Sequence, residues 1–278
     1  MQAILYIGHG SRVQAGNEEL NAFVEKAKAA HPNVEIQECC FLELAEPTIQ
    51  EGVESCIKKG ATKIAVVPVL LLTAMHVKVD IPEAIDKLKK RYPAVSFAYG
   101  RPIGIESTVI DIVKNRLKEA GFPLRDGRPN YEAREPISIL LVGRGSSDPD
   151  ATSDLMKIAR LVWEFTPVAD VDVCFLAATR PNVDEGLMRV NRLPNEKVYV
   201  VPYLLFTGVL MKGLQKQLDE WSKQSNKEYI LCDYLGFDDQ LITVLARRVQ
   251  EVLDENVLVN CDTCLYRTGF FEQQGAKG

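Results

Sequence analysis

The chain has 278 residues, 46% hydrophobic and 26% charged, with a formal net charge of −5. This composition is typical of a folded globular protein and excludes a disordered or fibrous chain. The acidic balance argues against a dedicated nucleic-acid binder. The longest apolar run, residues 64–75, is interrupted by Pro68 and Thr73 and is too short to span a bilayer. We therefore expect neither a nucleic-acid nor a membrane partner.

The N-terminal segment "MQAILYIGHGSR" has no basic region and meets a glycine-rich turn after a short apolar run. This pattern predicts a buried strand rather than a signal peptide. Without an export signal, the seven cysteines are expected to be thiols in a reducing cytoplasm.

Three sequence blocks occur twice, in the same order, at an offset of 134 or 135 residues. The first copies are "ILYIGHGSR" (4–12), "CFLELAEPTIQEG" (40–52) and "IAVVPVLLLTAMHVK" (64–78). The second copies are "ILLVGRGSS" (139–147), "CFLAATRPNVDEG" (174–186) and "VYVVPYLLFTGVLMK" (198–212). The chain is therefore predicted to contain two copies of one structural unit.

Each copy alternates short β-branched runs with amphipathic stretches of helical period. The predicted strands are 3–7, 34–40, 63–72 and 94–99, then 137–142, 171–176, 197–206 and 229–233. The predicted helices are 18–30, 82–91 and 105–120, then 150–165, 182–193, 209–224 and 239–254. This alternation predicts an α/β fold with two similar lobes, each a parallel sheet flanked by helices.

Capping residues mark several of these boundaries. Asn17 is the expected N-cap of the first helix, and Asp80 is expected to cap the helix that begins near Pro82. Gly121 is expected to end the helix of residues 105–120.

The domain boundaries follow from the repeat and from composition. Residues 1–121 are predicted to form the lobe with the active site, and residues 137–255 a duplicated lobe without the metal residues. A linker at 122–136 is rich in Gly, Pro and charge, and a cysteine-containing tail follows at 256–278.

His9, Glu43 and His76 each fall at the carboxyl end of a predicted strand. Ligands of open parallel sheets bind at this edge. Two imidazoles and a carboxylate that meet there suit a divalent first-row metal with an open coordination position. The third histidine, His31, lies in "AAHPN" and is expected in a solvated turn.

The duplication gives an internal comparison for these residues. In the second copy, the same three positions are occupied by Arg144, Ala177 and Leu210. The glycines that flank His9 are retained there as Gly143 and Gly145. The fold therefore does not require the three metal-ligating residue types, and their joint absence from one copy indicates that they belong to one site.

Basic and small polar residues near this edge are candidates for substrate binding. They are Ser11, Arg12, Lys78, Arg101 and Arg144. Arg144 takes the place of His9 in the second copy and could bind a carboxylate if the two copies face each other.

A Cys-x-x-Cys pair, Cys261 and Cys264, lies in the tail. Its spacing suits zinc or an iron–sulfur centre, but no second pair is nearby to complete four ligands. Such a site would need dimerisation or other ligands, and two thiols without a function remain an alternative.

The order of these motifs resembles that of the sirohydrochlorin chelatases, the cytosolic type II metal chelatases. The resemblance covers roughly residues 1–255 and rests on "GHGSR", "FLELAEPTI", "VVPVLLLTAMH" and "GRGSSDPD". The chain is most similar to the long, duplicated form, with its active site in the N-terminal half. The resemblance maps the metal ligands of the family onto His9, Glu43 and His76, while the tail cysteines are similar to those of some cobalt-type members.

The resemblance implies insertion of Fe²⁺ into sirohydrochlorin to give siroheme, with release of two protons. No cofactor beyond the metal substrate is implied, and the chain would be a monomer or homodimer. Three alternatives stay open. The metal could be Co²⁺, for anaerobic cobalamin synthesis. The protein could be a metal or tetrapyrrole carrier without turnover. A two-lobed solute- or nucleotide-binding enzyme would need a phosphate-binding turn, which "GHGSR" does not complete.

Overall fold

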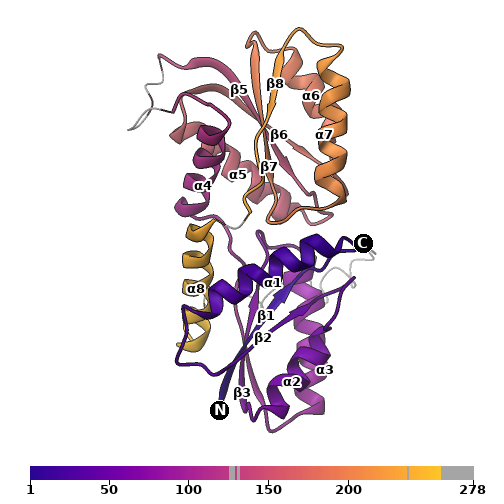
Figure 1. Cartoon of the computed structure of the whole chain (residues 1–278), viewed down its shortest axis with the longest axis vertical. Coiled ribbons are helices and arrows are strands. Elements are labelled where there is room, and N and C mark those ends of the chain that lie inside the picture. The colour runs from indigo at the N-terminus through magenta and orange to yellow at the C-terminus, as the bar shows by residue number, and fades with distance from the viewer. Residues whose placement is uncertain (125–128, 130–131, 237, 258–278) are drawn as a thin grey trace, which may run out of the picture. The chain divides into compact units, whose positions relative to one another are not determined.

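The computed structural model describes residues 1–124, 129, 132–236 and 238–257. These residues form two four-stranded sheets, each entirely parallel and each flanked by helices (Figure 1). The predicted α/β fold with two duplicated parallel sheets is confirmed. No helix in the described part of the chain has the length and apolar character needed to cross a membrane.

Apart from the π-helix η1, the two halves of the sequence contain the same elements in the same order. The first half contains β1 (Gln2–Gly8), α1 (Gln14–Lys28), β2 (Ile36–Phe41), α2 (Ile49–Lys58), β3 (Lys63–Pro68), the π-helix η1 (His76–Asp80), α3 (Ile81–Arg91), β4 (Ser96–Tyr99) and α4 (Ser107–Glu119). The second half contains β5 (Glu135–Gly143), α5 (Pro149–Phe165), β6 (Val168–Phe175), α6 (Val183–Asn191), β7 (Lys197–Tyr203), α7 (Val209–Ser222), β8 (Glu228–Leu231) and α8 (Asp239–Leu253). The strand orders are β2-β1-β3-β4 and β6-β5-β7-β8.

Both sheets are buried on their two faces, as parallel sheets usually are. Alternate residues of β1, namely Ala3, Leu5 and Ile7, pack in one cluster with apolar residues of α2 and α3. The intervening residues Ile4 and Tyr6 are also fully buried. The near-continuous apolar runs of the sequence therefore correspond to central strands.

The start of the first helix differs from the prediction. α1 begins at Gln14, and Asn17 lies inside it rather than at its N-cap. The Asn17 side chain accepts a hydrogen bond from the Ser11 backbone N–H and donates one to the Ser11 carbonyl, so it fastens the preceding loop. Periodicity also did not predict α2, although Thr48 and Glu51 form a capping box at its start.

The segment after β3 also differs from the prediction. β3 ends at Pro68 rather than at residue 72. Asp80 makes no capping hydrogen bond to α3, and residues 76–80 form a π-helical turn that continues into that helix. π-Helical turns of this kind are frequent at functional sites.

Packing divides the chain differently from the repeat. Among the described residues, one compact unit comprises residues 1–104 and 242–257, and the other lies within residues 105–241. α4, from the first half, therefore packs with the second sheet, beside α5 and β7. Most of α8, from the second half, packs with the first sheet, where its Ala246 carbonyl lies 3.2 Å from His31 Nε2. We call this arrangement the helix exchange.

Three further sequence predictions concern His31, Gly121 and the tail cysteines. His31 is half-buried rather than solvated, and this burial lowers its pKa below the ordinary value. Gly121 has a φ of 85° and follows the last turn of α4, as expected for a helix terminator. The predicted tail pair, Cys261 and Cys264, lies outside the described residues.

Candidate functional site

The strand order places the three candidate ligands at one edge of the first sheet. His9 follows β1, Glu43 lies two residues after β2, and His76 begins the π-helical turn after β3. β1 is central, with β2 on one side and β3 on the other. The chain therefore runs from β1 to a neighbour on one side and then crosses to the other side for β3. Open parallel sheets bind ligands at the carboxyl edge where the strand order reverses in this way.

Backbone hydrogen bonds hold the loops of His9 and Glu43 together. The Leu42 N–H donates to the Gly8 carbonyl (2.8 Å), and the Glu43 N–H donates to the His9 carbonyl (3.1 Å). The loops approach so closely that a Cβ on Gly10 would lie 1.8 Å from the Glu43 carbonyl oxygen. Gly10 also has a φ of 90°, which favours glycine. This contact therefore requires a glycine at position 10.

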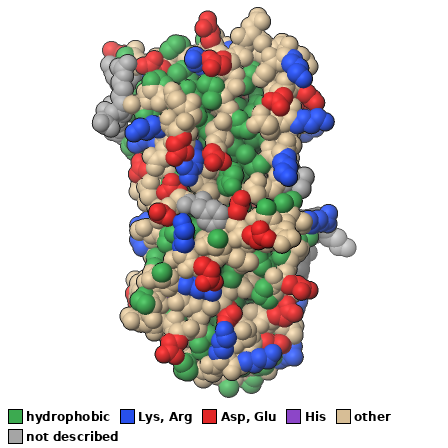
Figure 2. Space-filling model, viewed as in Figure 1, with side chains coloured by type: hydrophobic (Ala, Val, Ile, Leu, Met, Phe, Trp, Pro, Cys, Tyr) green, Lys and Arg blue, Asp and Glu red, His purple; other side chains and the backbone are tan. Residues whose placement is uncertain are grey.

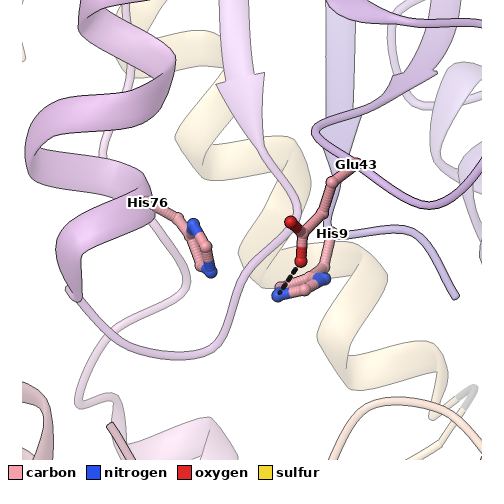
Figure 3. A group of neighbouring side chains, drawn as sticks. All are labelled: His9, Glu43 and His76. Carbon is pink, nitrogen blue, oxygen red and sulfur yellow. Dashed lines mark ion pairs between the residues drawn. The ribbon is translucent and has the colours of Figure 1, made fainter. Parts of the chain in front are cut away.

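The three side chains converge on one point (Figure 3). One ligand atom from each of His9, Glu43 and His76 lies within 4.8 Å of the others. His9 Nε2 is 3.6 Å from Glu43 Oε1, and the two imidazole rings stand at 89° with centroids 4.7 Å apart. Two nitrogens and one oxygen at these separations form a donor set that suits a divalent first-row cation.

Hydrogen bonds to Nδ1 orient both imidazoles. His9 Nδ1 lies 3.2 Å from the Gly10 carbonyl, which can only accept, so Nδ1 carries the proton. His76 Nδ1 lies 2.7 Å from Asp80 Oδ2, which likewise assigns the proton to Nδ1 of neutral His76. Each Nε2 then presents a lone pair, as in most histidine–metal sites.

Asp80 is a site residue that the sequence analysis missed, because it was interpreted as a helix cap. Its spacing of four residues from His76 was a usable signal, since such pairs lie on one face of a helical turn. The repeat carries a second signal. The positions of His76 and Asp80 correspond to Leu210 and Leu214, and Leu214 is fully buried in the second core. The carboxylate is thus absent where the histidine is absent.

Replacing Asp80 with alanine should weaken cation binding by about 10- to 100-fold, because His76 loses the carboxylate that fixes its orientation and basicity. Titration of the purified protein with Co²⁺ by calorimetry would measure this. Glu83→Ala, an exposed carboxylate in the first turn of α3, is the matched control and should bind Co²⁺ normally. Equal affinity in both variants would remove Asp80 from the site.

The other predicted residues are placed as follows. Ser11 lies in the loop after β1, where its hydroxyl accepts from the Val13 N–H, and Ser146 makes the same contact with Asp148 in the second copy. Arg12 is exposed and Lys78 lies half-buried on the π-helical turn. Arg101 donates two hydrogen bonds to Glu251 of α8. Arg144 is exposed and belongs to the second unit.

The cysteines in the described part of the chain are free thiols. Burial raises the pKa of Cys39, Cys56, Cys174 and Cys232 to about 12, and it also raises that of Cys40. Protonated thiols are poor metal ligands. Among the residues described, the one cluster with metal-ligand geometry is therefore His9, Glu43 and His76.

Acidic and basic side chains are interspersed on the face shown in Figure 2, rather than gathered by sign. This distribution agrees with the modest net charge of −5. On this face there is no extended positive field of the kind that nucleic-acid binding requires.

Comparisons with known proteins agree with this site and fold. The CbiX family model matches residues 3–120 and again residues 138–252, in keeping with the duplication. A sirohydrochlorin ferrochelatase of Priestia megaterium is 45% identical over 253 residues, which cover 91% of each chain. A sirohydrochlorin cobaltochelatase of the same organism is 42% identical over 98% of this chain and 87% of its own length.

The structure of SirB from Bacillus subtilis with Fe³⁺ is also similar. It matches with a TM-score of 0.79 and 45% identity, over 90% of this chain and 95% of that one. Family model, curated relatives and solved structure each cover most of the sequence, and the chain belongs to the CbiX family.

Proposed function

We propose that this chain inserts Fe²⁺ into sirohydrochlorin and releases two protons, giving siroheme. The observation that carries the proposal is the cluster of His9, Glu43 and His76 in one copy of a duplicated fold. The similar ferrochelatase and the SirB structure with Fe³⁺ support the same reaction and the same metal.

The site chemistry fits metal insertion. His9 Nε2, His76 Nε2 and a Glu43 oxygen bind the incoming cation and replace part of its water shell. Three protein ligands leave coordination positions open, so the pyrrole nitrogens of the macrocycle can enter as the metal leaves the protein. The two pyrrole protons must be accepted as the new bonds form, and a neutral imidazole or the Glu43 carboxylate can accept them.

The substrate carries several carboxylates, so the site needs nearby positive charge. Arg12 and Lys78 fit this role by position, since Arg12 lies in the loop after β1 with His9, and Lys78 lies on the π-helical turn that begins at His76. Ser11, Arg101 and Arg144 belong to the same proposal, although Arg101 is already paired with Glu251. We also propose a cytoplasmic location, since Fe²⁺ and the free thiols of the described residues both suit a reducing compartment.

Co²⁺ insertion is the second candidate function, favoured by the cobaltochelatase relative, which matches over 98% of this chain. Imidazole and carboxylate ligands do not choose between the two metals, because affinity follows the general order of divalent metals more than the biological one. A carrier without turnover would use the same ligands.

An anaerobic absorbance assay separates these functions. Sirohydrochlorin is incubated with Fe²⁺ or Co²⁺ and a tenth of an equivalent or less of enzyme. Repeated turnover above the spontaneous rate, lost in His9→Ala, is the expected result, and the two rates rank the metals. Metal binding that stops at one equivalent without turnover would contradict the proposal and favour the carrier.

A further inference from the structure

α8 contributes a buried arginine to the unit that contains the metal cluster. The Arg248 side chain is 2% exposed. Its Nε donates to the Pro102 carbonyl (3.0 Å), and its Nη2 donates to the Ile103 carbonyl (2.8 Å). Its Nη1 donates to Glu251 (2.7 Å), which also accepts two hydrogen bonds from Arg101. The guanidinium holds its N–H donors in one rigid plane, so it can donate to two adjacent carbonyls and a carboxylate in a fixed geometry.

The loop that accepts hydrogen bonds from Arg248 is itself hydrogen-bonded to the segment that leads to His76. The Ile103 N–H donates to the Leu70 carbonyl (2.9 Å), and the Gly104 N–H donates to the Leu71 carbonyl (2.8 Å). Leu70 and Leu71 lie between the end of β3 and His76. The contacts therefore run without interruption from Arg248, through the loop after β4, to the backbone that leads to a metal ligand.

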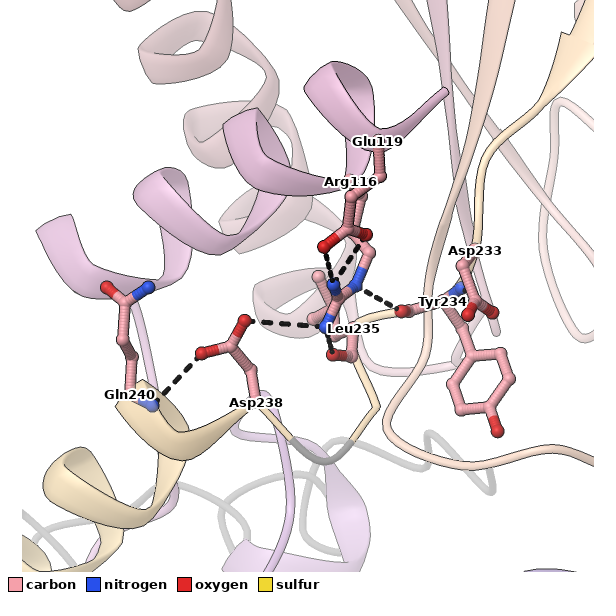
Figure 4. Close-up of polar contacts among 7 residues, drawn as sticks. All are labelled: Arg116, Glu119, Asp233, Tyr234, Leu235, Asp238 and Gln240. Carbon is pink, nitrogen blue, oxygen red and sulfur yellow. Dashed lines mark hydrogen bonds and ion pairs between the residues drawn. The ribbon is translucent and has the colours of Figure 1, made fainter. Parts of the chain in front are cut away.

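The second unit has a corresponding arginine network but no metal cluster among its described residues (Figure 4). Arg116 of α4 donates to the Tyr234 and Leu235 carbonyls, both at 2.9 Å, and it pairs with Glu119. The Leu235 N–H donates to the Leu204 carbonyl (3.0 Å), on the segment that leads to Leu210. Both units thus have an arginine that donates to two adjacent carbonyls of the loop after the fourth strand. Only in the first unit is that loop hydrogen-bonded to a segment that leads to a histidine.

We propose that Arg248 is a positioning residue for the metal site, through which the second half of the sequence sets the position of His76. This inference rests on the proposed function, since it assigns Arg248 to the same His9–Glu43–His76 site. Hydrogen bonding from Arg101 lowers the pKa of Glu251, so the network around Arg248 stays charged at neutral pH.

The test compares Arg248→Lys with Arg116→Lys, which replaces the corresponding guanidinium in the other unit. The readouts are the melting temperature, the dissociation constant for Co²⁺ without tetrapyrrole, and the visible d–d spectrum of bound Co²⁺. Both variants should lose similar stability. Only Arg248→Lys should weaken Co²⁺ binding, by about tenfold, and alter the spectrum, as loss of an outer-shell partner does.

The outcomes separate a failure of this inference from a failure of the proposed function. If neither variant changes Co²⁺ binding, or both change it equally, Arg248 is structural only. If wild-type Co²⁺ binding persists in His76→Ala, the proposed function fails instead, independently of Arg248. If Arg248→Lys does not fold, Glu251→Gln against Glu119→Gln repeats the comparison with a milder change to each network.

Discussion

His76→Ala should abolish metal insertion while the protein stays folded. His76 is one of two imidazole donors in the cluster, and its Nε2 has no substitute among the described residues. Because loss of an outer-shell partner alone costs about 10- to 100-fold, loss of a ligand should lower kcat/KM for Fe²⁺ insertion by more than about 100-fold. Initial rates of siroheme formation under anaerobic conditions would measure this.

His31→Gln is the control for this variant, because His31 is a histidine outside the cluster. It should retain wild-type turnover. The melting temperature of His76→Ala should stay close to that of the wild type, since partly exposed side chains contribute little to stability. Full activity in His76→Ala would show that the cluster is not the site of insertion.

Gly10→Ala should damage the site without removing any ligand. Its Cβ would lie 1.8 Å from the Glu43 carbonyl oxygen, and its φ of 90° is strained for alanine. The strain should cost about 1–3 kcal/mol of stability. The loops of His9 and Glu43 must also move apart, and a displacement of about 1 Å can lower activity by about 100-fold. Thermal unfolding and insertion rates would measure the two effects separately.

Gly145→Ala is the matched control, because the repeat reproduces the contact. Its Cβ would lie 1.8 Å from the Ala177 carbonyl oxygen, at a φ of 91°. The stability loss should therefore be similar, but Co²⁺ affinity should be unchanged. If Gly10→Ala and Gly145→Ala affect Co²⁺ binding alike, the effect of Gly10 reflects global stability rather than the geometry of the site.

Much of the fold could be predicted because the sequence repeats itself. Strand positions follow from apolar runs, and parallel strands end at a common edge, so His9, Glu43 and His76 could be expected to meet. The duplication made this expectation stronger, because the same edge of the second copy carries Arg144 and Leu210 instead. The role of the cluster in catalysis stays a prediction.

Other features could not be predicted, for identifiable reasons. Asp80 resembles a helix cap in sequence, and only the π-helical turn brings it to His76. Asn17 is a good N-cap residue, but its amide satisfies the Ser11 backbone instead. The helix exchange has no local signature at all, since α4 and α8 have the same apolar faces whichever sheet they cover.

The helix exchange also sets the order in which the protein can be completed during synthesis. The first sheet leaves the ribosome early, but the helix that carries Arg248 follows only after residues 105–241. At about 5–20 residues per second, that interval is on the order of ten seconds. For that time the loop at Pro102 and Ile103 lacks its buried arginine partner. The nascent first sheet thus has an incomplete face, and the metal-binding unit can close only after α8 has been synthesised.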